Sequence, residues 1–309
     1  MLPRVWLPPR QAILGGQTEV LVVGGGPAGL GAAYGAATAG ARVILAERYG
    51  FLGGNATAAL VMPLTSFHTQ GPIAEPVKTR LLPNDHGPGA PVIAGALQVF
   101  LERLIHAGGV IPPSLETGYV VPFDPEIFKL TALDLLDEAG VPYLLHAFAS
   151  GIIDRPMPPA GEEKAVADYR LPATDNQYVV FETKSGPLVI GANVVIDCTG
   201  KGTVLRRLPP GAAYDIPLRC LLPRIEEGEK VRTGEGRSPS SSSSLPAHLL
   251  DYLLVAGRCI SGTHEASSSY RSMPASIATG QAAGVCAALA TRAQIRPRDV
   301  PAADSVPAG

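Results

Sequence analysis

A glycine-rich segment near the N-terminus has the side chains and spacing to hold a dinucleotide. Gly24, Gly26 and Gly29 form G-x-G-x-x-G, with Pro27 and Ala28 in the second gap. Gly24 would permit a tight turn, Gly26 would let the backbone approach a pyrophosphate, and Gly29 would let the following helix pack close to the strand. The N-terminus of that helix would offer free N–H groups and a partial positive charge to the phosphates.

A carboxylate completes this motif. Glu47 lies 18 positions after Gly29 (47 − 29), near the spacing of about 20 expected for the acid that accepts the ribose hydroxyls. A negative charge there would repel a 2′-phosphate, so an NADP-type ligand is disfavoured. The motif by itself leaves FAD and NAD both open.

The elements around the motif supply the context that it requires. Residues Glu19–Val23 predict a short buried strand, Leu30–Ala39 a helix of small residues, and Ala41–Ala46 a second strand. Together they make a β-α-β unit of about thirty residues. A nucleotide-binding α/β fold is therefore expected.

Further elements are predicted along the chain. The patterns favour helices at Val92–Ala107, at Pro125–Glu138 with Asp124 as N-cap, and at Pro274–Ala290. They favour strands at Val141–Ala149, Val194–Ile196 and Leu253–Ala256, and a hairpin formed by Tyr178–Thr183 and Pro187–Ala192. Arg237–Pro246 is serine-rich and predicts a flexible connection.

Composition narrows the class of protein. Of 309 residues, 46% are hydrophobic and 17% charged, which indicates a globular chain, and the net charge of −2 offers no basic field for nucleic acid or an anionic membrane. The four cysteines form no C-x-x-C pair, so no metal site is expected. We expect a cytoplasmic protein, because the N-terminal residues contain no apolar run typical of a signal peptide.

Four separated motifs resemble the FAD-dependent oxidoreductase family with a glutathione-reductase-type FAD domain. They are residues 20–61, which begin VLVVGGGPAG, residues 124–153, which begin DPEIFKL, the turn VVIDCTGKG at 194–202, and residues 253–290, which begin LLVAGRCISGTHEA. The resemblance implies non-covalently bound FAD and the fold class α/β, a Rossmann-type doubly wound parallel sheet with a small β-meander.

The resemblance also assigns residues to the cofactor. Arg48 and the stretch Leu52–Thr57 would run along the pyrophosphate and ribityl chain, and the backbone near Phe148 would approach the adenine. N–H groups at the helix start after Pro274 would point at the flavin N1/O2 edge, which becomes negative on reduction. The residues expected to contact FAD are Gly24, Gly26, Pro27, Ala28, Gly29, Glu47, Arg48, Gly54, Asn55, Ala56, Thr57, Phe148, Thr199, Gly200, Gly257, Arg258, Ala275, Ser276 and Ile277.

Chemistry in this family is hydride transfer to or from flavin N5, with the protein orienting the substrate and supplying a base. Three residues are candidates for catalysis. His264 lies in the segment that resembles the flavin-facing one and would accept a proton near neutral pH. Arg271 would bind an anionic substrate bidentately. His68 follows the second strand and would face the ring.

The sequence departs from the family in its substrate region. Gly200 and Leu253 are only 53 positions apart (253 − 200), where members usually carry a substrate domain. We therefore expect one FAD-binding domain over residues 1–309, with a reduced substrate or cap region at 60–120 and 203–250. The small-molecule substrate is not specified by the sequence.

Two other interpretations stay open. A thiamine thiazole synthase resembles this chain in length and in lacking a large cap. The second alternative is a chain that is not an enzyme in isolation: a flavin-binding subunit or truncated relative that needs a partner for activity, with a second copy or a partner subunit covering the flavin. The molecule that co-purifies would separate the first alternative from an FAD oxidoreductase, and turnover by the purified chain would separate the second.

Overall fold

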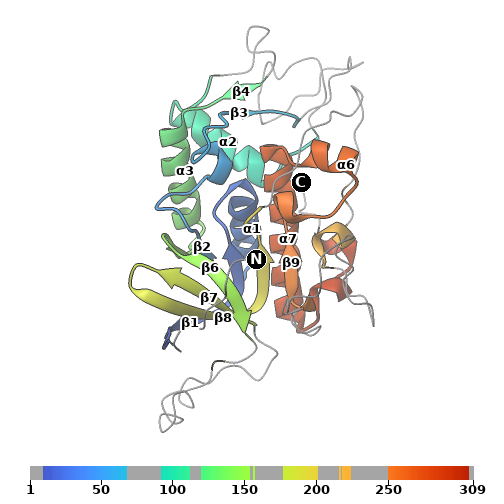
Figure 1. Ribbon diagram of the computed structural model, residues 1–309. Helices are drawn as coiled ribbons and strands as arrows, with labels where there is room; N and C mark the ends of the chain where they lie inside the picture. The colour runs from blue at the N-terminus through green and yellow to red at the C-terminus, as the bar shows by residue number, and fades with distance from the viewer. Residues whose placement is uncertain are drawn as a thin grey trace, which may run out of the picture.

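The computed structural model describes residues 10–67, 92–111, 120–153, 156, 177–200, 216, 218–223 and 250–305. In these ranges, a parallel sheet is formed by β5 (Tyr143–Leu144), β2 (Val43–Ala46), β1 (Ile13–Val23), β8 (Gly186–Asp197) and β9 (Leu253–Val255), in that order. β1 is the centre: it pairs in parallel with β2 on one side and with β8 on the other (Figure 1).

An antiparallel meander leaves this sheet through β8. The first half of β8 pairs with β7 (Gln177–Thr183), which pairs with β6 (Phe148–Ile153), whereas the end of β8 pairs with β9. The predicted hairpin at Lys184–Gly186 is confirmed. The separate strand predicted at Val194–Ile196 is wrong, because β8 runs unbroken from Gly186 and pairs with β1 along both halves.

The two faces of β1 bury their side chains in different layers. Val20 and Val22 belong to the cluster shared with the helices, while Leu21 and Val23 belong to the cluster shared with the meander residues Val179 and Phe181. This alternation is the period of two expected of a strand buried on both faces. The α/β fold class and the small meander predicted from the sequence are confirmed.

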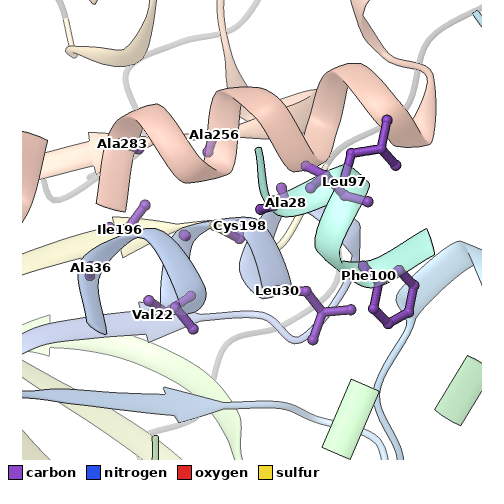
Figure 2. Packing of buried hydrophobic residues seen from close by; sticks show 14 of the residues in the cluster. Val22, Ala28, Leu30, Ala36, Leu97, Phe100, Ile196, Cys198, Ala256 and Ala283 are labelled. Carbon is purple, nitrogen blue, oxygen red and sulfur yellow. The ribbon is translucent and has the colours of Figure 1, made fainter. Parts of the chain in front are cut away.

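In the described ranges, the first face is covered by helices. They are α1 (Pro27–Thr38), α2 (Ala96–His106), α3 (Pro125–Glu138) and α7 (Met273–Ala293). In Figure 2, side chains from β1 (Val22), α1 (Leu30) and α2 (Phe100) lie in one buried cluster with residues of β8 and α7. The remaining short elements are β3 (Pro63–Leu64) paired with β4 (Val121–Pro122), α6 (His264–Tyr270), and 3₁₀ helices at Gly54–Ala56, Leu218–Leu221, Gly257–Cys259, Pro297–Asp299 and Ala302–Ser305.

α1 and α7 cross at backbone contact because glycines lie at their interface. A Cβ on Gly31 would lie 2.1 Å from the Ile277 carbonyl oxygen, and one on Gly280 would lie 2.0 Å from that of Ala28. By length and composition α7 is apolar enough to cross a membrane, yet 72% of its most apolar window is buried inside the protein. Its composition therefore matches that of a core helix. This crossing brings the N-termini of α1 and α7 to the same edge of the sheet.

The boundary of one predicted strand is wrong. The segment Val141–Ala149 is not one strand, because it turns between β5 and β6 at His146, whose φ is +57°. The His146 N–H donates to the Tyr49 carbonyl at 2.9 Å, which fixes the turn against the loop after β2. Arg237–Pro246 lies outside the described residues.

Candidate functional site

The site lies at the carboxyl ends of the parallel strands. Gly24 follows β1, Glu47 follows β2, Cys198 follows β8, and Gly257 lies two positions after Val255, the last residue of β9. Ligands of open α/β sheets bind at this edge, where the strand order reverses about the first strand. A cleft of about 280 Å³ opens here, lined by Val23, Gly24, Gly26, Pro27, Ala28, Ala46, Glu47, Arg48, Tyr49, Gly54, Asn55, Ala58, Ala59, Ala147, Phe148, Ala149, Cys198, Thr199, Gly200, Arg258, Arg271 and Ser276.

The glycine-rich loop has the conformation that its sequence requires. Gly24 has a φ of +106°, and a Cβ there would lie 2.8 Å from the Cys198 carbonyl oxygen. A Cβ on Gly29 would lie 1.7 Å from the Gly24 carbonyl oxygen, so this helix packs as closely as predicted. A Cβ on Gly26 would meet only the Gly54 Cα, at 3.7 Å, so the space beside Gly26 is open on the cleft.

Glu47 lines the cleft and is 5% exposed. Its Oε2 accepts a hydrogen bond from the Gly25 N–H at 2.6 Å, and its Oε1 accepts one from the Tyr49 N–H at 2.9 Å. A carboxylate offers about four acceptor positions, so capacity remains for two hydroxyl donors. Glu47 therefore holds the glycine loop as well as facing the cleft, a role that its spacing in the sequence did not reveal.

Aromatic and cationic side chains follow Glu47. The Arg48 guanidinium lies 4.6 Å from the centroid of the Tyr49 ring and donates to the Tyr49 hydroxyl at 2.8 Å. Phe148 is 53% exposed and lines the same cleft, so its ring lies at the mouth. Tyr49 was not predicted as a site residue. It comes two positions after the acid, but nothing in its own pattern separated it from a surface aromatic.

Positive charge also lies in the cleft after β9. Arg258 lies over Gly200: a Cβ on Gly200 would be 3.1 Å from both Nε and Nη2 of Arg258, and Gly200 has a φ of +66°. Gly257 approaches Ala28 so closely that a Cβ on it would lie 2.6 Å from the Ala28 Cβ. Arg258 is thus placed beside the N-terminus of α1, and in the described ranges it forms no ion pair.

A carboxylate and a thiol join the loops after β8 and β9. Asp197 Oδ1 accepts from the Thr199 N–H at 2.9 Å and from the Thr199 hydroxyl at 2.7 Å. The Cys259 thiol donates to the same oxygen at 3.6 Å and accepts from the Gly200 N–H at 3.1 Å. Burial, followed by the Asp197 charge, raises the pKa of Cys259, so its thiol stays protonated and can donate. Cys259 therefore helps to fix the Gly200 turn under Arg258.

Not every predicted cofactor residue lines the cleft. Six of them are not among its lining residues: Gly29, Ala56, Thr57, Gly257, Ala275 and Ile277. The Thr57 hydroxyl donates to the Leu52 carbonyl at 2.7 Å, so it holds the turn around Gly53. Of the predicted catalytic residues, Arg271 lines the cleft, and the backbone of His264 begins α6. His68 lies outside the described residues.

The fold and the cleft define a dinucleotide-binding α/β protein: a glycine loop at a helix N-terminus, a buried acid after the second strand, and the arginine Arg258 beside the loop. A family model for FAD dependent oxidoreductases matches residues 19–208 and 241–307. The chain belongs to this family, and FAD is the cofactor that the match indicates. Among the described residues, no group of three or more His, Cys, Asp or Glu side chains is placed to hold a metal ion.

No curated protein matches the chain. Among solved structures, similarity extends to THI4 of Thermovibrio ammonificans, with 16% identity over 90% of each chain and a TM-score of 0.41. It extends also to OxyS anhydrotetracycline hydroxylase of Streptomyces rimosus, with 14% identity over 60% of this chain and a TM-score of 0.34. The chain spans 32% of OxyS and 40% of p-nitrophenol 4-monooxygenase PnpA of Pseudomonas putida, which is 14% identical over 59% of this chain with a TM-score of 0.33.

Proposed function

We propose that this chain binds FAD in the manner of the glutathione-reductase type and transfers a hydride between a small organic substrate and the flavin. The observation that carries the proposal is that one cleft brings a buried acid, Glu47 after β2, and an arginine, Arg258 after β9, to either side of the N-terminus of α1. This arrangement matches a molecule with a ribose at one end of a diphosphate.

The cleft fits the cofactor in its details. The open space beside Gly26 is where a phosphate would approach the N–H groups of α1. The Ser276 residue is 6% exposed and lines the cleft, and its hydroxyl has no hydrogen-bond partner in the described part of the chain. Tyr49, next to Glu47, and Phe148 offer aromatic surface in the cleft, against which the adenine would lie.

FAD, when bound, supplies the acceptor or donor of the hydride. The residues of the chain bind and orient: Glu47 would hold the ribose, and Arg258 would neutralise the diphosphate. His264, at the first position of α6, is proposed as the base that takes the substrate proton. His68 is proposed as a second group facing the ring.

The short interval between Gly200 and Leu253 supports a further part of the proposal. A reduced substrate region would leave the flavin exposed in an isolated monomer, and a second subunit would then cover it. Quenching of flavin fluorescence by iodide tests this: strong quenching in a monomer is expected, and a protected flavin in a monomer would contradict it.

The experiment that tests the function is the identification of the molecule released when the purified protein is denatured in acid. Intact FAD, with its mass and absorption spectrum, is expected. A thiazole–adenine adduct would instead indicate a thiamine thiazole synthase activity, and NAD would place the chain among nicotinamide-dependent enzymes. Bleaching of the bound flavin by an organic substrate without oxygen would then demonstrate reduction of the cofactor.

A further inference from the structure

Residues 58–63 form an apolar strip on the surface beside the cleft. Their sequence is AALVMP, which has no polar side chain, and all six residues are exposed. The larger side chains, those of Leu60, Val61 and Met62, are 58%, 45% and 40% exposed. Single exposed apolar residues are normal on a protein surface, but several in succession are typical of a binding site.

The backbone of the apolar strip is held in place. The Val61 N–H donates to the Asn55 carbonyl at 3.1 Å, and the Met62 carbonyl accepts from the Phe123 N–H at 3.2 Å. Leu60 has a φ of +53°, a conformation that residues with a bulky side chain rarely adopt. Such strain persists only where the surrounding structure fixes it, and it is concentrated at functional sites. The strip therefore presents its apolar side chains from a fixed backbone.

The apolar strip continues the lining of the cleft. Its first two residues, Ala58 and Ala59, line the cleft together with Gly54 and Asn55. The Ala58 N–H donates to the Gly54 carbonyl at 2.7 Å, so the strip begins one turn after Gly54. A molecule that extends out of the cleft past the two alanines would therefore meet the larger apolar side chains next.

Contacts along the glycine loop relate the strip to the cofactor. Gly25 lies against Glu47, whose carboxylate accepts its N–H at 2.6 Å, and the next residue, Gly26, lies beside Gly54. The segment that leads to the strip thus passes from the acid to the N-terminus of α1. On the proposed function, the ribose and the diphosphate of FAD follow the same course, and the flavin comes next, beside the start of the strip.

Two kinds of occupant would cover the strip: the apolar part of a substrate, or a second copy of the chain. A stable interface between copies takes about 20–30 residues from each side, and the strip has six. A small molecule, in contrast, is held by a few apolar side chains next to the polar groups that orient it. The length of the strip and its continuity with the cleft both favour the substrate.

We infer that the apolar strip binds the hydrocarbon part of the substrate, and that the substrate is a small organic molecule with an uncharged apolar portion. This inference rests on the proposed function, because the strip is placed relative to FAD. Leu60, Val61 and Met62 bury the hydrocarbon, while the reacting atom of the substrate lies past Ala58 and Ala59 at the flavin.

The test uses the full chain loaded with FAD. Phenol and its 4-methyl, 4-ethyl, 4-propyl and 4-butyl derivatives are titrated while the absorption spectrum of the flavin is recorded. We expect saturable shifts of the spectrum, with a Kd that falls by about fourfold for each added carbon, which is the factor for burying one CH₂ group.

A polar version of the strip keeps the approximate size of its side chains. Val61→Thr and Met62→Gln are close in shape to the residues that they replace, and Leu60→Asn suits a positive φ. In the triple variant the Kd of 4-butylphenol should rise by at least about tenfold and that of phenol by less, with the affinity for FAD unchanged. Leu130→Gln is the control, because Leu130 is 62% exposed on α3 and is not among the residues that line the cleft. It should leave both affinities unchanged.

The outcomes separate this inference from the proposed function. A chain that binds no FAD refutes the proposed function and the inference with it. If FAD binds but no phenol shifts its spectrum, or if the triple variant binds 4-butylphenol as tightly as the wild type, the inference alone is wrong. Sedimentation measures the remaining alternative: a wild-type dimer that becomes a monomer in the triple variant would show that the strip is an interface between copies, which also overturns the inference.

Discussion

Replacing Glu47 by glutamine should weaken both the apo protein and its affinity for FAD. The carboxylate accepts hydrogen bonds from the Gly25 and Tyr49 N–H groups at 2.6 and 2.9 Å while 5% exposed. A glutamine side chain has one acceptor oxygen, so it can satisfy only one of these donors, and its NH₂ group would face the other. Losing one charge-assisted bond and orphaning a buried donor costs about 2–4 kcal/mol.

Two assays measure the two roles of Glu47 separately. Thermal unfolding of the apo protein should show a Tm lower by at least about 4 °C in Glu47→Gln. FAD titration of the folded variant should show a Kd raised by about tenfold or more, since the ribose hydroxyls lose a charged acceptor. Glu19→Gln is the control: Glu19 accepts one backbone N–H, from Arg42, and lies 3.6 Å from the Arg42 Nε, at a half-buried site where the pairing of β1 with β2 begins. An apo Tm unchanged in Glu47→Gln would refute the structural role, and an unchanged Kd would refute the ribose contact.

Three further predictions concern the elements that hold the cleft. Gly280→Ala should lower the free energy of unfolding by about 1–3 kcal/mol despite the helix propensity of alanine, because its Cβ overlaps the Ala28 carbonyl oxygen. Gly151→Ala is the control, because a Cβ on Gly151 would have no atom within 4 Å. Equal denaturation midpoints for the two variants would count against the helix crossing. Cys259→Ser should retain FAD binding while Cys259→Ala weakens it several-fold, as measured by fluorescence titration; equal affinities would exclude a role for the thiol hydrogen bonds. The pKa of Cys259 is raised in the folded protein, so the protonated thiol contributes stability below the usual thiol pKa, and this contribution is lost as pH rises through the folded value. The free energy of unfolding, measured with urea, should therefore fall less steeply above about pH 9 in Cys259→Ser than in the wild type.

The sequence predicted those parts of the fold that depend on neighbouring residues. α3 begins and ends as expected, because Asp124 caps it through bonds from Glu126 and Ile127 and Pro125 fits the first turn. The glycine loop and Glu47 were found for the same reason, since their spacing along the chain fixes their geometry. Val194–Ile196 was mistaken for a separate strand because Gly191 and Asn193 interrupt the apolar pattern.

Contacts between distant parts of the chain could not be predicted. The N-terminus of α2 is capped by Gln281, whose Oε1 accepts from the Ala96 N–H 185 positions away. The pairing of Cys259 with Asp197 and the position of Tyr49 in the cleft likewise appear only when the strands are assembled. The site was predicted where a motif covers it and missed where long-range packing builds it.

The central claim is that the cleft beside Gly26 receives the diphosphate of FAD, and Gly26→Ala tests it most directly. Gly26 has a φ of −76°, and a Cβ there would meet no protein atom closer than 3.7 Å, so the fold should tolerate alanine with an unchanged apo Tm. The same Cβ would occupy the space through which a phosphate approaches the helix. We predict an FAD Kd raised at least about tenfold in a titration of the apo variant, a loss of about 1.4 kcal/mol or more. An alanine variant that is equally stable and binds FAD as tightly as the wild type would show that the diphosphate does not lie there.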